Sequence, residues 1–152
     1  MAQRDPKKWD DRFMAVARVV RDWSSDPRKR VGAVVVSPDG RQLSAGYNGL
    51  PRDFEEKLAG VILPKEEKNK LTLHAESNAL SQAPCDVTGW TLYVTTAPCL
   101  RCALEVHRSG VARVVVDTSI DPASSWCDDQ AEAQAFLQRM GVEQVYLSGA
   151  EG

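Results

Sequence analysis

The sequence predicts a three-layer α/β/α fold in which helices flank a mixed sheet of five strands. Five short runs rich in β-branched and aromatic residues recur along the 152 residues, and helical patterns separate the last three of them. Strands that alternate with helices pair in parallel through right-handed crossovers, whereas the first two runs are joined by a short turn. The expected sheet is therefore mixed, and residues 1–152 are expected to form a single domain.

The first half of the chain is expected to form one helix and one hairpin. Residues 8–23 carry apolar residues at helical spacing, and the run "VGAVVVS" at 31–37 is typical of a buried strand. The residues "PDG" at 38–40 favour a turn, so residues 41–48 are the second strand of an antiparallel hairpin.

A long surface loop is expected next, at residues 49–71, because this stretch is charged and contains two prolines. One helical turn is expected inside it, around 53–59. The remaining elements are expected in this order: a helix at 73–82, a strand at 89–96, a helix at 98–110, a strand at 111–117, a helix at 128–140 and a strand at 142–148.

Net charge and the length of apolar runs disfavour two classes of protein, those that bind long nucleic acid and those that span a membrane. The net charge of −2 and the pI of about 5.7 argue against a protein that depends on binding long nucleic acid, which usually shows a basic excess. No apolar run approaches the roughly 20 residues that a membrane helix needs, and the polar start lacks the apolar core of a signal peptide. A cytoplasmic location is the resulting expectation, and a reducing compartment disfavours disulfides among the four cysteines.

Two short motifs contain the residues best suited to a metal site. His74 and Glu76 open a predicted helix in "TLHAESNAL", and Cys99 and Cys102 lie in the first turn of another in "PCLRCAL". A spacing of two does not place His74 and Glu76 on one helix face. At a helix start, however, side chains can project past the end toward a common point. Cysteines at the positive end of a helix dipole favour the thiolate, which is the form that binds metal.

One histidine and two cysteines are three protein ligands, the number typical of catalytic zinc, which leaves its fourth position to water. Zinc lowers the pKa of that water toward about 7. Glu76 is suited to accept the proton and to pass it to a leaving group. The pattern therefore predicts hydrolytic attack on an electrophilic carbon.

A C-x-x-C pair alone also fits a structural zinc site or a redox pair. The redox motif would follow the first strand, which it does not do here. A fourth zinc ligand would have to be His107, Cys85 or Cys127. His107 lies five residues after Cys102 and is expected to pack or face solvent, while both cysteines fall in predicted loops as unligated thiols.

The combination of "HAE" at 74–76 with "PCLRC" at 98–102 resembles the zinc-dependent cytidine and deoxycytidylate deaminase superfamily, whose pattern is H-x-E followed by P-C-x-x-C. The resemblance covers about residues 10–147 and implies a cytidine-deaminase-like fold. It also implies that Glu76 shuttles protons while an exocyclic amine is displaced, with Zn²⁺ held by His74, Cys99 and Cys102.

Within that superfamily, "VGAVVV", "GYNGLPR" and "HAESNAL", in this order, are similar to the deoxycytidylate (dCMP) deaminases. This resemblance implies conversion of dCMP to dUMP, which supplies thymidylate synthesis. It also implies that Asn48 contacts the sugar or the base and that the Ala75 backbone amide holds the base carbonyl. Asn-Gly is also a turn dipeptide, so Asn48 has a structural interpretation as well. Trp126 is expected either to cover the nucleotide or to pack.

The same resemblance implies a homo-oligomer, a hexamer or a dimer, that dCTP activates and dTTP inhibits with Mg²⁺. The effector pocket would involve the "GYNGLPR" region, and the candidate phosphate contacts are Arg52 and the basic run Arg28, Lys29 and Arg30, with a solvated charge run as the alternative. A second, structural zinc is not expected, because the 53–71 loop lacks a further ligand set.

Other substrates and one other class of protein stay open on the sequence alone. The substrate alternatives are modified dCMP, dCTP, cytidine, guanine, a riboflavin precursor and tRNA adenosine. Deaminases that act on tRNA adenosine need a basic surface, and a net charge of −2 does not indicate one. A catalytically inactive scaffold is disfavoured, because it would have no need of the Glu76 carboxylate.

Overall fold

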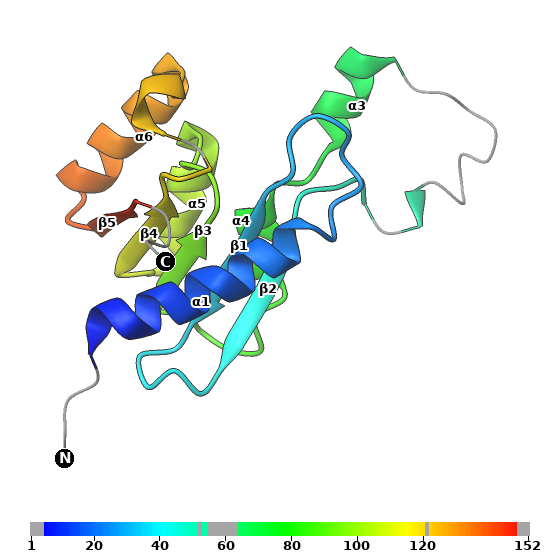
Figure 1. Ribbon diagram of the computed structural model, residues 1–152. Coiled ribbons are helices and arrows are strands. Elements are labelled where there is room, and N and C mark those ends of the chain that lie inside the picture. Colours follow the sequence, from blue (N-terminus) through cyan, green and yellow to red (C-terminus); the bar gives the residue numbers. More distant parts are fainter. Residues whose placement is uncertain (1–4, 52, 55–63, 121, 149–152) are drawn as a thin grey trace.

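The computed structural model describes residues 5–51, 53–54, 64–120 and 122–148. Five strands form one sheet in the order β2-β1-β3-β4-β5 (Figure 1). The β1–β2 and β1–β3 pairs are antiparallel, and the β3–β4 and β4–β5 pairs are parallel. The mixed sheet predicted from the sequence is therefore confirmed. The strands are β1 (Gly32–Val36), β2 (Leu43–Tyr47), β3 (Thr91–Val94), β4 (Arg113–Asp117) and β5 (Glu143–Leu147).

Helices cover both faces of the sheet, which confirms the three-layer fold (Figure 1). Alternate residues of β1 point to opposite faces: Val34 belongs to the core cluster that includes residues of α1, whereas Ala33 belongs to the cluster that includes residues of α4, α5 and α6. Among the described helices, none has both the length and the apolar character needed to cross a bilayer. The helices are α1 (Pro6–Arg21), α3 (Lys65–Leu71), α4 (Ala75–Ser81), α5 (Leu100–Ser109) and α6 (Asp128–Arg139), with a 3₁₀ turn at Ala123–Ser125.

The first helix begins and ends two residues earlier than the 8–23 predicted from apolar spacing. Its start is set by Asp5, whose carboxylate accepts a hydrogen bond from the Lys7 N–H at 3.1 Å, followed by Pro6 at the first helical position. Both residues are strong start signals. The first residue of α1 is therefore set by capping, and the spacing of apolar residues gives no information about a cap.

The expectation that residues 49–71 form a loop is wrong for the last part of this segment, where α3 forms. None of its residues is buried, so it lacks the apolar periodicity that predicts a helix. Its charges explain why it is helical: Glu66 and Glu67 lie in the first turn, and Lys68 and Lys70 lie in the last. The helical turn expected at 53–59 falls mostly outside the described residues.

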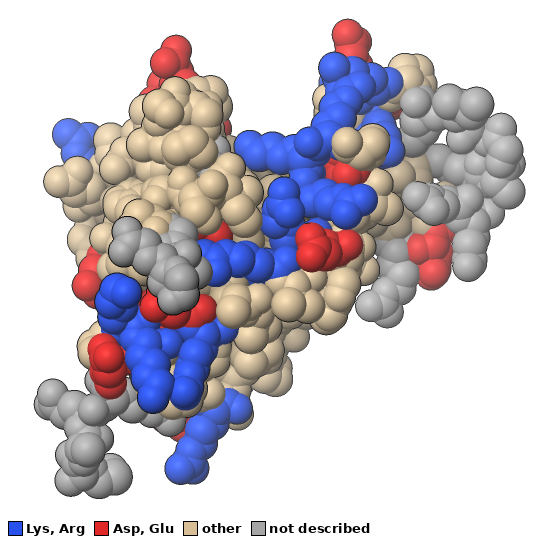
Figure 2. Space-filling model, viewed as in Figure 1, with Lys and Arg blue, Asp and Glu red and all other residues tan. Residues whose placement is uncertain are grey.

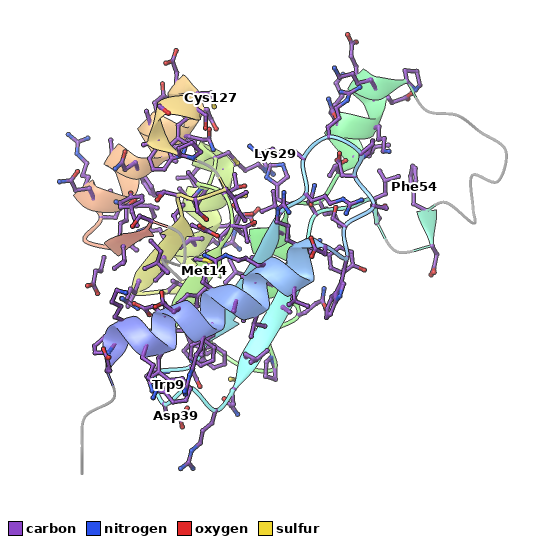
Figure 3. All side chains as sticks on the ribbon, viewed as in Figure 1. Trp9, Met14, Lys29, Asp39, Phe54 and Cys127 are labelled. Carbon is purple, nitrogen blue, oxygen red and sulfur yellow. The ribbon has the colours of Figure 1, made fainter. Side chains whose placement is uncertain are left out.

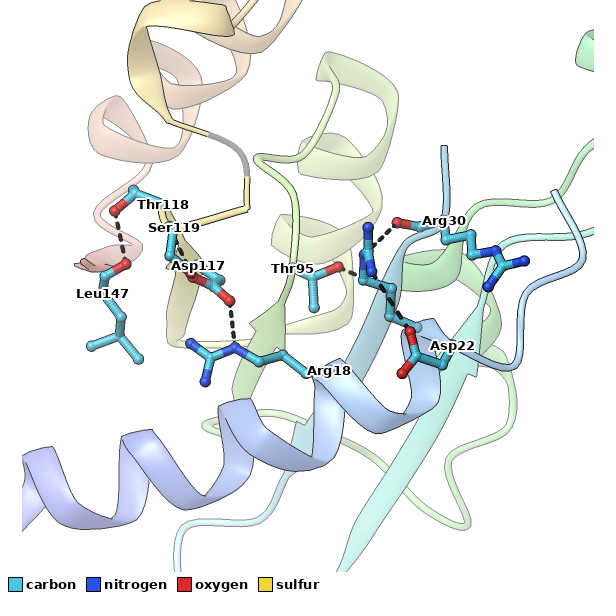
Figure 4. A network of polar contacts seen from close by, with 10 residues as sticks. Arg18, Asp22, Arg30, Thr95, Asp117, Thr118, Ser119 and Leu147 are labelled. Atoms are coloured by element: carbon cyan, nitrogen blue, oxygen red, sulfur yellow. Dashed lines mark hydrogen bonds and ion pairs between the residues drawn. The ribbon is translucent and has the colours of Figure 1, made fainter. Parts of the chain in front are cut away.

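Two ion pairs with buried carboxylates hold α1 against β4. Arg18 Nε lies 2.6 Å from the Asp117 carboxylate, which is fully buried and also accepts hydrogen bonds from the Ser119 N–H and hydroxyl (Figure 4). Arg113 of β4 makes a two-pronged contact with Asp10 of α1, through Nη1 at 2.7 Å and Nη2 at 2.5 Å. Each buried carboxylate thus has a cationic partner, as burial of a charge requires.

The contact between β2 and α4 depends on a glycine. A Cβ added to Gly46 would lie 2.5 Å from the Ala75 carbonyl oxygen and still closer to the Ala79 nitrogen. Both are backbone atoms of α4, so they cannot move away as a flexible side chain would. Gly46 therefore sets how close α4 lies to the sheet.

We expect Gly46→Ala to lower the free energy of unfolding by about 1–3 kcal/mol, the usual cost of overpacking. The matched control is Gly49→Ala, because a Cβ at Gly49 would meet nothing within 4 Å. Urea denaturation of both variants measures the difference. Equal stabilities for the two variants would contradict the proposed close approach of α4.

Candidate active site

Two helix starts meet on one side of the sheet. His74 is the N-cap of α4 and Cys99 is the N-cap of α5, and both have extended backbone angles. Neither side chain makes a capping hydrogen bond, so each is available to project past its helix end. α4 packs against α5, and the two side chains meet: His74 Nδ1 lies 3.6 Å from Cys99 Sγ and 3.2 Å from Cys102 Sγ.

The spacing of these three donor atoms fits a zinc ion. The atoms lie within 4.8 Å of one another. Tetrahedral zinc with ordinary bond lengths requires about 3.6 Å between a nitrogen and a sulfur ligand and about 3.8 Å between two sulfurs. Two thiols and an imidazole are also donors that zinc prefers. The group formed by His74, Cys99 and Cys102 is therefore compatible with zinc binding.

Hydrogen bonding within this group favours one thiolate. The Cys102 side chain, and then His74, lower the pKa of Cys99 to about 4, although burial opposes the shift. The hydrogen bond with Cys99 raises the pKa of His74, and the pKa of Cys102 is also raised. Such a group concentrates negative charge on sulfur, the form of cysteine that coordinates a metal.

Glu76 lies two residues after His74, in the first turn of α4, and its side chain lines the same cavity. Only 5% of its surface is exposed. Burial raises its pKa, partly opposed by its own backbone N–H and by the charge of His74. A carboxyl group that binds a proton more readily than usual is suited to carry protons during a reaction near neutral pH.

The start of α6 supports the start of α5. Because the Cys99 side chain does not cap its own helix, the first N–H of α5, that of Leu100, donates to the Asp129 carboxylate at 3.0 Å. The buried Gln130 donates from Nε2 to the Ala97 carbonyl at 2.9 Å and accepts from the Cys127 N–H at 3.0 Å. Asp129 and Gln130 thus hold the segment that carries Cys99. The sequence prediction missed both residues, since Leu100 and Ala97, the residues that they hold before and at the start of α5, lie about 30 positions away.

A cavity of about 310 Å³ opens onto the group formed by His74, Cys99 and Cys102, the candidate metal-binding group. This volume is at the lower end of the range for small-molecule sites. Its walls come from the loop before β1, the segment from α3 to α4, the loop before α5 and the start of α6. Its described lining is formed by Asp26, Lys29, Val31, Asn48, Asn69, Thr72, His74, Ala75, Glu76, Thr96, Ala97, Cys99, Cys127 and Gln130.

Asn48 lines this cavity and also supports the loop before β1. Its Oδ1 accepts from the Val31 N–H at 2.8 Å, and its Nδ2 donates to the Lys29 carbonyl at 2.7 Å. The Ser24 hydroxyl donates to the Asn48 carbonyl at 2.8 Å. An amide nitrogen has two hydrogens, so the bond to Lys29 leaves Asn48 one donor for a ligand. The structural role and the proposed ligand contact are therefore compatible.

Some candidate residues lie away from the cavity. Trp126 packs against Tyr146, with ring centroids 5.6 Å apart, and lines a separate small space; this favours packing over contact with the nucleotide. His107 meets the Phe136 ring edge-on, in agreement with its expected packing role. Arg28 is exposed and is not part of the described cavity lining. Arg52 lies outside the described residues.

Comparison with known proteins identifies the family. Residues 7–118 match the family described as the cytidine and deoxycytidylate deaminase zinc-binding region. The chain therefore belongs to this deaminase family, and the resemblance found in its sequence motifs is confirmed.

Relatives of this chain include proteins named deoxycytidylate deaminase. It is 34% identical over 141 residues to an uncharacterised deaminase of Aliivibrio fischeri, covering 92% of this chain and 94% of that protein. It is 33% identical to the deoxycytidylate deaminase of Homo sapiens over 73% of this chain, and spans 65% of the human protein's length. The dCMP deaminase of cyanophage S-TIM5, solved with dCMP and dUMP, has a TM-score of 0.73 and 26% identity over 95% of this chain and all of its own.

Metal analysis tests the candidate zinc ligands. We expect about one zinc per purified chain and almost none after Cys99→Ala, because two remaining ligands hold zinc weakly. Cys85→Ala is the matched control, since Cys85 is an exposed free cysteine outside the metal-binding group. Mass spectrometry of the metal content gives the stoichiometry. Zinc retained by the Cys99 variant, or lost from the Cys85 variant, would contradict this ligand set.

Proposed function

We propose that this protein is a zinc-dependent deaminase that hydrolyses dCMP to dUMP and ammonia, and so supplies thymidylate synthesis. The observation that carries the proposal is the meeting of His74, Cys99 and Cys102 at a cavity that the buried carboxyl group of Glu76 also lines. Membership of the deaminase family and the similarity to several deoxycytidylate deaminases support dCMP as the substrate.

Glu76 is the residue that transfers protons in the proposed reaction. When bound by the three ligands, zinc supplies Lewis-acid activation of water for attack on an electrophilic carbon. Glu76 takes the two protons of the attacking water one after the other, and delivers one to the ring nitrogen and one to the departing amine. A C–O bond forms at the ring carbon that carried the amine, the C–N bond breaks, and ammonia leaves. The raised pKa of Glu76 suits this exchange.

Two neighbouring residues are suited to position the pyrimidine nucleotide. The Ala75 N–H belongs to the first turn of α4, where backbone donors have no partner within the helix. It is proposed to donate to the base carbonyl, and the small Ala75 side chain leaves room for a flat ring. The second Nδ2 hydrogen of Asn48 is proposed to contact the sugar or base.

Regulation and assembly are proposed from the sequence resemblance alone. The chain is expected to form a homo-oligomer, a hexamer or a dimer, with dCTP as activator and dTTP with Mg²⁺ as inhibitor. Arg28 and Arg52 stay candidate effector contacts, and a cytoplasmic location stays a prediction.

Replacement of Glu76 by Gln separates metal binding from proton transfer. We expect Glu76→Gln to keep zinc and to lower kcat by about 10²–10⁴-fold, the usual contribution of a positioned acid–base group. Glu105→Gln is the control, because Glu105 is a nearby carboxyl group on α5 outside the described cavity lining. Steady-state rates and zinc content are measured together. Normal turnover by the Glu76 variant would refute its proposed role.

A substrate panel tests the proposed activity. We expect dCMP to be turned over with the highest kcat/KM among dCMP, CMP, dCTP, cytidine, guanine and adenosine in an RNA hairpin. Loss of the cytosine absorbance and release of ammonia report the reaction. Absence of turnover with every deoxycytidine nucleotide would overturn dCMP deamination, and preferred turnover of guanine or the RNA would reassign the substrate.

A further inference from the structure

The start of α6 contacts the chain on both sides of Cys99, one of the three candidate zinc ligands. On one side, the buried Gln130 donates from Nε2 to the Ala97 carbonyl at 2.9 Å. On the other side, the Asp129 carboxylate accepts from the Leu100 N–H at 3.0 Å. Both contacts come from neighbouring residues of α6, which packs against α5. The short segment that contains Cys99 is therefore held at both ends by a helix that supplies none of the three candidate ligands.

The start of α6 also borders the cavity. Figure 3 shows Cys127, the N-cap residue, at the start of this helix, and Cys127 lines the cavity together with His74 and Cys99. The Cys127 N–H donates to Gln130 Oε1 at 3.0 Å. Through its two ends, the Gln130 side chain thus joins the N-cap of α6 to the loop before α5. The start of α6 is therefore fixed beside the candidate metal-binding group.

The Asp129 contact replaces the cap that Cys99 does not provide. The first N–H groups of a helix have no partner within the helix, and the side chain of the N-cap residue usually accepts from one of them. Cys99 is the N-cap of α5, and its side chain makes no capping hydrogen bond. Because Asp129 accepts from the Leu100 N–H, one donor of this first turn is satisfied from outside the helix. Cys99 Sγ is then available to meet His74 Nδ1, which lies 3.6 Å away.

We propose that Asp129 is a positioning residue for zinc: by accepting from the Leu100 N–H, it keeps Cys99 in the place where it binds the metal. This inference rests on the zinc site of the proposed function. Partners that orient zinc ligands from outside the coordination shell commonly change metal affinity by about 10- to 100-fold. Asp129 acts on the backbone beside a ligand and not on the ligand itself, so we expect an effect near the lower end, about tenfold.

Zinc affinities of Asp129→Ala and Asp129→Asn test this contact from the acceptor side. Alanine has no acceptor, whereas asparagine keeps a side-chain carbonyl oxygen that can accept from the Leu100 N–H. We expect the zinc dissociation constant to rise about tenfold in Asp129→Ala and to stay within about threefold of the wild-type value in Asp129→Asn. Competition of the zinc-loaded proteins with a chromogenic zinc chelator measures these constants without any substrate.

Leu100→Pro removes the same hydrogen bond from the donor side. Proline has no backbone N–H and is favoured at the first position of a helix, which is the position of Leu100 in α5. The extended backbone of Cys99 is also the conformation that a following proline favours.

Leu100→Ala is the matched control for this variant, because the Leu100 side chain packs against the core and both variants lose it. We expect zinc affinity to fall about tenfold further in Leu100→Pro than in Leu100→Ala. Adding Asp129→Ala to Leu100→Pro should cause no additional loss, since the donor is already absent.

Asp128→Ala is the control for surface charge. Figure 2 shows acidic side chains at the surface over α6, and Asp128 lies beside Asp129 in the first turn of this helix. The hydrogen bond to the first N–H of α5 is made by Asp129 and not by Asp128. We expect the zinc affinity of Asp128→Ala to stay near the wild-type value. Thermal denaturation of all zinc-loaded variants checks that they fold.

The outcomes separate this inference from the proposed function. Unchanged zinc affinity in Asp129→Ala, or an equal loss in Asp128→Ala or Asp129→Asn, would overturn the positioning role while the zinc site and dCMP deamination stood. A further loss when Asp129→Ala is added to Leu100→Pro would also overturn it, because the effect would not pass through the Leu100 N–H. A wild-type protein that bound no zinc would overturn the zinc site and this role together. Zinc binding that responds to Asp129 as expected, without turnover of dCMP, would support this role and refute the proposed deamination.

Discussion

The site depends on two helices that begin at the same point without capping themselves. At the starts of α4 and α5, the residues that would normally satisfy the first backbone N–H groups are His74 and Cys99. Their side chains turn toward each other and toward Cys102. Two helix ends with positive partial charge therefore surround a group that holds thiolate, and the cap that Cys99 does not supply comes from Asp129 of α6. The proposed metal binding and the proposed acid–base chemistry therefore depend on how three helices pack at this junction.

The sheet fixes where the junction can form. Gly46 allows α4 to approach β2 until backbone lies against backbone. The parallel pairing of β3 with β4 places the start of α5 beyond the end of β3, which is where α/β sheets usually bind ligands.

On the opposite face of the sheet, Asp10 accepts hydrogen bonds from both Arg113 and the Tyr93 hydroxyl, and burial raises the pKa of Tyr93. Rigid packing on that face keeps the strands in place under the site.

The fold, and the meeting of His74, Cys99 and Cys102, could be predicted from the sequence because both leave local patterns. Runs such as 31–37 have strand composition, and the H-x-E and C-x-x-C spacings are short-range features. The missed features have other causes. α3 is stabilised by charge and has no buried face, so an apolar pattern cannot detect it. Asp129 and Gln130 hold Leu100 and Ala97, which are distant from them in sequence, and these contacts appear only when the chain is folded.

The proposed chemistry requires that three protein ligands hold one zinc and leave a fourth position open. X-ray absorption spectroscopy of the purified zinc protein measures this coordination. We expect two sulfur scatterers at about 2.3 Å and two nitrogen or oxygen scatterers at about 2.0–2.1 Å, one from His74 and one from solvent. Three or four sulfur scatterers would mean that Cys85 or Cys127 completes a closed structural site. That result would contradict the open coordination on which the proposed deamination depends.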